Sequence, residues 1–151
     1  MRNRYYDLNT YFQSIFGCRV QKITIDAGLT CPNRDGTIST GGCIFCNDRG
    51  SGSGASNRGL SLTDQLLQGK NFLSRRYKAK KFIAYFQSFS NTYAPPEILK
   101  RLYDEALAVE DIVGLAIGTG LEMDRWRHCP HPDTTNHILS VADKPGITVI
   151  L

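Results

Sequence analysis

Residues 81–117 read KFIAYFQSFSNTYAPPEILKRLYDEALAVEDIVGLAI, and their two apolar runs on either side of an amphipathic segment predict the fold. The runs 81–87 and 112–117 are almost continuously apolar, which is typical of parallel strands covered on both faces. Between them, Pro95 and Pro96 predict the first turn of a helix. One side of this helix carries the apolar residues Ile98, Leu99, Leu102, Tyr103, Ala106 and Leu107. We therefore expect a β-α-β unit.

A similar pattern precedes this unit. The segment 21–26, QKITID, is rich in β-branched residues and predicts a strand. A helix is expected from Ser61, because Asp64 completes an imperfect capping box three residues later. Its apolar side is formed by Leu62, Leu66, Leu73 and Tyr77. The order β-α-β-α-β implies right-handed crossovers and a parallel sheet, so the fold class is α/β.

Length and composition are those of an ordinary globular domain. The 151 residues fit one domain, with 41% hydrophobic and 21% charged residues. No apolar run approaches the roughly 20 residues that span a bilayer, and the N-terminus has no apolar stretch of signal-peptide length. We therefore expect a cytoplasmic protein with no membrane partner. The net charge of +4 permits an RNA partner but does not require one.

Three cysteines follow the first predicted strand. Cys31, Cys43 and Cys46 lie in CPNRDGTISTGGCIFC, at the end of the strand where active loops of parallel βα folds lie. Three thiolates can hold an iron–sulfur cube and leave one iron open to another ligand, which is the interpretation we favour. A redox pair would leave Cys31 unexplained. A structural zinc site needs a fourth ligand, for which the chain offers Cys18, His128, His131 and His137.

The chain resembles the radical S-adenosylmethionine (radical SAM) superfamily over about residues 5–118, and more narrowly an uncharacterised bacterial subgroup related to the Elp3-like proteins. Three stretches carry the resemblance: VQKITIDAGLTCPNRDGTISTGGCIFCNDRGSG (20–52), AYFQSFSNTYAP (84–95) and VGLAIGT (113–119). The first gap between cysteines is longer than the superfamily's common Cys-x3-Cys-x-aromatic-Cys spacing, a variation that this subgroup shares.

The resemblance implies a cofactor, a reaction and a set of ligands. Cys31, Cys43 and Cys46 would ligate a 4Fe–4S cluster, and the free iron would bind S-adenosylmethionine. The reduced cluster would cleave this cofactor to a 5′-deoxyadenosyl radical. The backbone at Phe45 would lie beside the adenine. A flavodoxin or ferredoxin is the expected reductant, and a tRNA nucleoside is the expected substrate.

Other residues near the predicted site have two interpretations each. Gln87, Ser88 and Asn91 stand where the superfamily often carries a Gly-Gly-Glu-like segment that holds the amino group of the cofactor; turn capping is the alternative. Arg34 and Arg49 would raise the potential of a cluster, or they are solvated loop arginines.

By the same resemblance, the chain corresponds to a partial (β/α) barrel, with about the first three βα units. Residues 1–120 would form the N-terminal half of the radical SAM core. Residues 121–151 form an atypical tail, which we interpret as frame-shifted or poorly ordered and in which only 146–151 predicts a strand. We expect a truncated product in which the open edge of the third strand promotes association with another chain.

Two alternatives to a radical SAM enzyme stay open. The first is a non-catalytic, zinc-stabilised module that binds nucleic acid, and the second is an inactive truncated remnant. A basic run near the end of the first predicted helix would contact RNA, although the helix dipole and solvation also account for it. The run consists of Arg75, Arg76, Lys78, Lys80 and Lys81.

Overall fold

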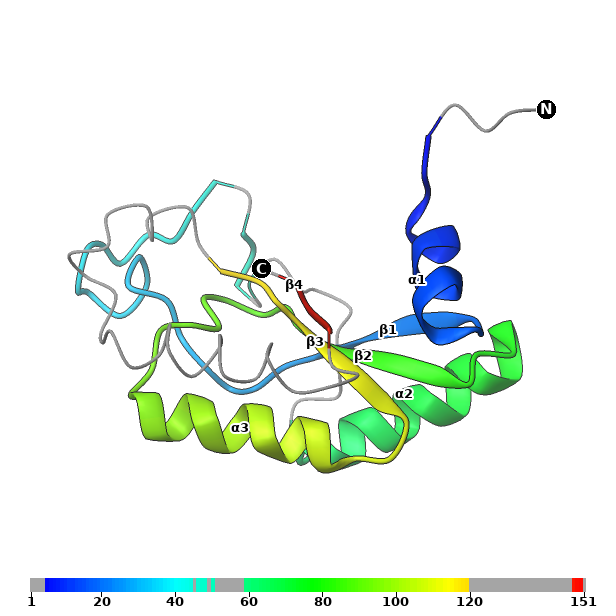
Figure 1. Cartoon of the computed structure of the whole chain (residues 1–151). Coiled ribbons are helices and arrows are strands. Elements are labelled where there is room, and N and C mark those ends of the chain that lie inside the picture. Colours follow the sequence, from blue (N-terminus) through cyan, green and yellow to red (C-terminus); the bar gives the residue numbers. More distant parts are fainter. Residues whose placement is uncertain (1–4, 45, 49, 51–58, 120–147, 151) are drawn as a thin grey trace.

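The computed structural model describes residues 5–44, 46–48, 50, 59–119 and 148–150, which form a parallel sheet with helices on both faces (Figure 1). The helices are α1 (Leu8–Phe16), α2 (Leu62–Tyr77) and α3 (Pro96–Ala108), and the strands are β1 (Val20–Ile25), β2 (Lys81–Phe86), β3 (Ile112–Ile117) and β4 (Thr148–Ile150). The two helices and three strands predicted for residues 21–117 are confirmed; the bounds of the strands and the starts of the helices differ from the predictions by one residue at most.

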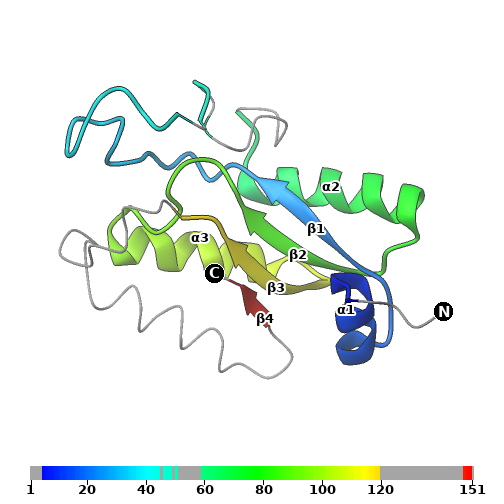
Figure 2. The same cartoon turned by 90° about the horizontal axis from the view of Figure 1, so that it is seen from above.

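The sheet has four parallel strands in the order β1-β2-β3-β4, the same order as in the sequence. The crossover helices α2 and α3 both cover one face of this sheet, and α1 lies against the other face (Figures 1 and 2). Because the strands are parallel and adjacent, their C-terminal ends lie along one edge of the sheet. The loops that follow β1, β2 and β3 are therefore neighbours.

The larger part of the core lies between the sheet and the helices α2 and α3. Ile25, Phe86 and Leu99 are buried there, and the ring of Tyr103 meets the ring of Phe86 edge to face with 5.2 Å between centroids. The remaining buried residues of this cluster come from both helices and from β1, β2 and β3. Alternate residues of β1 and β2 point to this side, as strand geometry requires.

The helix α1 was not among the predicted elements. Asp7 caps its N-terminus by accepting a hydrogen bond of 3.0 Å from the N–H of Thr10, and Gly17 ends it with a φ of +66°. Phe12 and Phe16 pack onto the sheet face that α2 and α3 leave uncovered, where they meet Val20 of β1 and other apolar residues. A helix of nine residues is marginal alone, so this packing stabilises it.

The prediction that β3 has an open edge is wrong. Residues 114–116 of β3 pair in parallel with β4, from Gly114↔Thr148 to Ala116↔Ile150. In the part of the chain that the structure describes, the strands with a neighbour on one side only are β1 and β4. The rest of the predicted tail, residues 121–147 and 151, lies outside the described residues.

None of the described helices has both the length and the apolar character needed to cross a membrane.

Candidate functional site

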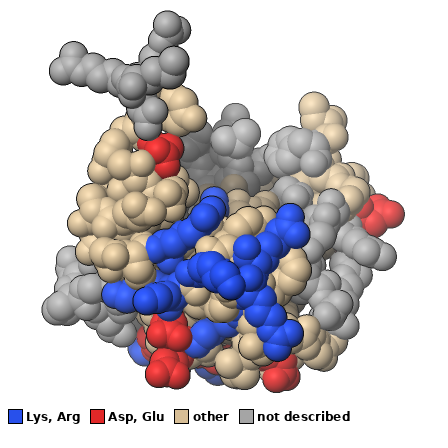
Figure 3. All heavy atoms as spheres, turned by 90° about the vertical axis from the view of Figure 1, so that its right-hand side faces the viewer, with Lys and Arg blue, Asp and Glu red and all other residues tan. Residues whose placement is uncertain are grey.

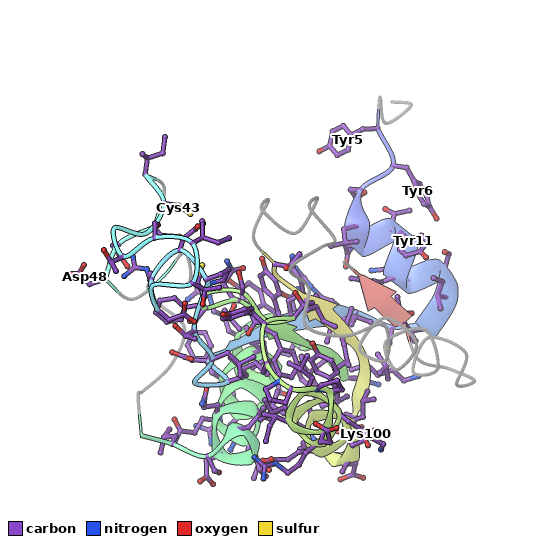
Figure 4. The ribbon with its side chains drawn as sticks, turned by 90° about the vertical axis from the view of Figure 1, so that its left-hand side faces the viewer. Tyr5, Tyr6, Tyr11, Cys43, Asp48 and Lys100 are labelled. Carbon is purple, nitrogen blue, oxygen red and sulfur yellow. The ribbon has the colours of Figure 1, made fainter. Side chains whose placement is uncertain are left out.

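The candidate site is the loop that follows β1, residues 26–50, which we call the cysteine loop. It lies over the C-terminal edge of the sheet, where neighbouring chain segments are joined by hydrogen bonds from Gln87 N–H to Ile25 O (3.3 Å) and from Gly118 N–H to Phe86 O (2.8 Å). Cys43 and Asp48 of this loop lie on the opposite side of the molecule from Tyr5, Tyr6 and Tyr11 of the N-terminal segment and α1 (Figure 4).

The cysteine loop folds back on itself just after Cys31. The carbonyl oxygen of Cys31 accepts hydrogen bonds from the N–H groups of Arg34 (2.9 Å) and Asp35 (3.2 Å), which form a turn. Gly42 N–H then donates to Asn33 O at 2.8 Å, so the segment before Cys43 returns to the turn at Cys31. A separate turn, closed by Cys46 N–H and Cys43 O at 3.0 Å, relates the last two cysteines.

The thiols differ in burial. Cys31 is buried, with 8% of its surface exposed, whereas Cys43 and Cys46 are half-buried, and none of the three is in a disulfide. Among the described residues, no three His, Cys, Asp or Glu side chains are grouped closely enough to hold a metal ion. A bound metal therefore requires the three thiols to move closer together than they lie here.

The donor chemistry of the loop fits an iron–sulfur cluster. All three sulfurs belong to one loop, in which the bond between Gly42 and Asn33 joins the segment after Cys31 to the segment before Cys43. The side-chain amide of Asn33 also donates to the Sγ of Cys43 at 3.2 Å, and N–H donors to sulfur are a usual feature around cluster thiolates. Phe45, expected beside the adenine of a cofactor, lies outside the described residues, as does Arg49.

Cys18 does not join these thiols. It lies at the turn between α1 and β1, where β1 begins, and Cys31 lies beyond the other end of that strand. The six residues of β1 rise about 3.3 Å each, so Cys18 and Cys31 are at opposite ends of the sheet. A zinc site at the cysteine loop cannot take its fourth ligand from Cys18. His128, His131 and His137, the other fourth ligands considered, lie outside the described residues.

The predicted residues after β2 lie in a loop next to the cysteine loop. Ser88 and Asn91 are buried and Gln87 is half-buried. The backbone N–H and the side-chain Nδ2 of Asn91 both donate to Gly118 O, at 3.0 and 2.9 Å, and Tyr103 Oη donates to Asn91 O at 2.6 Å. Through these bonds Asn91 holds the loop in place, a structural role similar to the turn capping that we considered as the alternative to cofactor binding. Its Oδ1 is buried without a hydrogen-bond partner among the described residues.

Phe89, in the loop after β2, contacts the cysteine loop. This role was not predicted from the sequence. Phe89 has a φ of +63°, which is rare for a residue with a side chain. Gly50 of the cysteine loop packs against it so closely that a Cβ on Gly50 would lie 3.0 Å from Phe89 N. Arg34 lies over its ring, with Cζ 5.5 Å from the centroid, and donates to Asn47 O at 2.6 Å. Arg34 is therefore not simply a solvated loop arginine.

A second contact between the loops involves Thr37 and Tyr93, whose hydroxyl groups are 2.8 Å apart. The N–H and the hydroxyl of Thr37 also lower the pKa of the neighbouring Asp35 below its usual value. Close by, the loop residues 28–30 and 93–97 line a largely apolar cavity of about 750 Å³. Thr30, which precedes Cys31 in the sequence, lies on the wall of this cavity.

Comparison with known proteins finds uncharacterised relatives. The chain is 46% identical over 116 residues to the uncharacterized protein YtqA of Bacillus subtilis (77% of this chain and 36% of that protein). It is 40% identical over 104 residues to the protein YhcC of Escherichia coli K12 (69% and 32%), and 36% identical over 112 residues to the uncharacterized protein MJ0486 of Methanocaldococcus jannaschii (72% and 33%). The chain thus spans about a third of the length of these curated relatives. No family model matches the chain, and no solved structure does.

Proposed function

We propose that the chain carries the cluster-binding part of a radical SAM enzyme. The observation that carries this proposal is the position of three cysteines on one folded-back loop, directly after the first strand of a parallel sheet. The loops at this end of the strands form the active sites of parallel βα enzymes. The sequential strand order, with both crossover helices on one face, supports a partial (β/α) barrel as the scaffold.

In this proposal Cys31, Cys43 and Cys46 hold a 4Fe–4S cluster that, when bound, reductively cleaves S-adenosylmethionine to a 5′-deoxyadenosyl radical. The chain's own groups hold and shield this centre. Burial of Cys31 keeps water from one side of it, and Arg34 places a positive charge next to the loop. The backbone at Phe45 and the side chains of Gln87, Ser88 and Asn91 would contact the organic cofactor. The Oδ1 of Asn91, which has no hydrogen-bond partner among the described residues, would accept a hydrogen bond from an ammonium group.

A tRNA nucleoside is the proposed substrate, with a flavodoxin or ferredoxin as reductant. Lys and Arg side chains gather on the face where β1 and β2 begin and α2 ends (Figure 3). Arg19 and Arg76 both lie on the ring of Tyr77, and Lys81 lies over Phe16. Such a surface attracts the phosphates of RNA, and because it lies at the opposite end of the sheet from the cysteine loop, it would hold a part of the tRNA away from the modified nucleoside. Replacing Arg76 with Glu should weaken binding to a tRNA and reduce the salt dependence of that binding, whereas Lys100→Glu, on α3, should do neither.

Anaerobic reconstitution with iron and sulfide tests the cluster. The wild-type chain should bind iron and sulfide with a broad visible absorption, and form 5′-deoxyadenosine from S-adenosylmethionine under dithionite. Cys31→Ala, Cys43→Ala and Cys46→Ala should each lose the absorption, whereas Cys18→Ala should keep it. Stoichiometric, colourless zinc that is fully four-coordinate at these thiols would overturn the proposal in favour of the zinc-stabilised module. Cluster binding without 5′-deoxyadenosine would identify an inactive remnant.

A further inference from the structure

Asn33 is the most buried polar side chain within the cysteine loop, and its position calls for an explanation. Only 6% of its surface is exposed, although the residues that follow it, 35–41, are all exposed. Burying an amide in a loop is unfavourable unless the amide is hydrogen-bonded. The partners of Asn33 therefore indicate what the buried side chain does.

The backbone carbonyl and the side-chain amide of Asn33 both form hydrogen bonds to residues across the loop. Its carbonyl oxygen accepts from Gly42 N–H at 2.8 Å and from Ser39 Oγ at 3.0 Å. Its side-chain Nδ2 donates to Cys43 Sγ at 3.2 Å. One residue, two positions after Cys31, thus bonds both to the backbone that leads into the second cysteine and to the sulfur of that cysteine.

The next residue, Arg34, closes the loop from another side. Its guanidinium lies against Gly42, where a Cβ would be 3.0 Å from Nη2, and it bonds to Asn47 O beyond Cys46. Asn33 and Arg34 therefore contact the chain on both sides of the Cys43–Cys46 pair. Asn33 forms a hydrogen bond to a sulfur, whereas the described bond of Arg34 is to the backbone oxygen of Asn47, so the two residues have separable effects.

We propose that Asn33 is a positioning residue that ties Cys43 to the turn after Cys31 and donates a hydrogen bond to the sulfur of Cys43 when that sulfur binds iron. This inference rests on the proposed function. A hydrogen bond to a cluster thiolate stabilises the reduced, more negative state and raises the reduction potential. Removing the donor should therefore change the potential, and not only the amount of iron bound.

The test compares Asn33→Leu and Asn33→Asp, which remove the donor at nearly constant size, with Ser39→Ala. The Ser39 variant loses a hydrogen bond to Asn33 O but leaves the amide-to-sulfur contact in place. After anaerobic reconstitution of the full chain, EPR-monitored titration should show a more negative midpoint potential for both Asn33 variants, with Asn33→Asp shifted further because it adds a negative charge. Ser39→Ala should keep the wild-type potential. Equal potentials for wild type and both Asn33 variants would overturn the proposal.

Hydrogen exchange, measured on the chain without iron, distinguishes a failure of this inference from a failure of the proposed function. Both Asn33 variants should increase amide exchange in residues 38–44 by about tenfold, the effect of losing one buried hydrogen bond, while α2 and α3 keep their protection. If the wild-type chain binds no iron yet exchange rises in this way, the proposed function fails and the positioning role stands. Unchanged exchange in both variants would overturn the positioning role.

Discussion

Asn91 bonds twice to the carbonyl oxygen of Gly118, through its backbone N–H at 3.0 Å and its side-chain Nδ2 at 2.9 Å. The two residues belong to the loops that follow β2 and β3, so one side chain joins two neighbouring loops at the C-terminal edge of the sheet. Asn91 has no exposed surface, and Tyr103 of α3 donates to its carbonyl oxygen. The loop that faces the cysteines is therefore anchored to the core.

The first prediction concerns this anchor. Asn91→Ala should lower the free energy of unfolding by about 1–3 kcal/mol, because it removes a buried hydrogen bond. Asn91→Asp should cost more, since a carboxylate would face the oxygen of Gly118 in place of a donor. Thr92→Val, which breaks the 2.8 Å hydroxyl contact with Thr119 at the edge of the same loop, should cost less than either. Urea unfolding measures all three, and equal losses for Asn91→Ala and Thr92→Val would contradict the assignment.

The second prediction concerns the close packing of Gly50 on Phe89. Gly50→Ala should loosen the cysteine loop, because the residue has a φ of +76° and its Cβ would lie 3.0 Å from Phe89 N. We expect a loss of roughly 1 kcal/mol in stability, together with less iron retained after reconstitution. Gly41→Ala, in the same loop but with open space around its Cβ and no positive φ, is the matched control and should change neither quantity.

The third prediction concerns the contact between α2 and β1. A Cβ on Gly69 would lie 2.3 Å from Cγ2 of Ile23, so Gly69→Ala should destabilise the chain by about 1–3 kcal/mol through overpacking, despite the higher helix propensity of alanine. In a double-mutant cycle, Ile23→Ala should remove most of this cost, since it removes the clashing atom. Asn71→Ala, at an exposed position of the same helix, should not destabilise. Additive effects of the Gly69 and Ile23 substitutions in chemical unfolding would contradict the contact.

The fourth prediction concerns the N-terminal cap of α1. The hydroxyl of Thr10 first, and then its N–H, lower the pKa of Asp7 below the ordinary value of an aspartate. Because the folded-state pKa is depressed, the ionised cap stabilises α1 at pH values above about 4 and this stabilisation is lost as the pH falls through the lowered pKa. NMR titration of the Asp7 carboxyl group should show the low pKa, and Thr10→Val should raise it toward the ordinary value. An unchanged pKa in that variant would contradict the hydroxyl contact.

Local patterns predicted most of the elements because each signal lies within a few residues. The continuous apolar run of β3 matches its structural bounds, Ile112–Ile117, and Ser61 caps α2 with Asp64 as expected. The short helix α1 was not predicted, although Asp7 and Gly17 cap it. Its apolar residues are explained by their packing on a face of the sheet, and no local sequence pattern reveals that face.

The candidate site also has residues that the local sequence pointed to and residues that it did not. Spacing alone predicted Cys31, Cys43 and Cys46 as one set of ligands, since thiol chemistry is readable from residue type, and this stays a prediction. The roles of Asn33 and Phe89 were not readable, because they arise from burial at 6% exposure and from a left-handed backbone conformation. Both depend on how two loops meet.

The sequence by itself determined where the strands and the two crossover helices form, and it supplied the cysteines proposed to bind a metal, because apolar periodicity, caps and side-chain chemistry are local properties. Only the tertiary structure decided that β4 covers the edge of β3, that Cys18 lies at the far end of the sheet, and that the loops after β1 and β2 pack together. These outcomes depend on contacts between residues far apart in the chain, which form only when the parallel strands bring their ends to one edge.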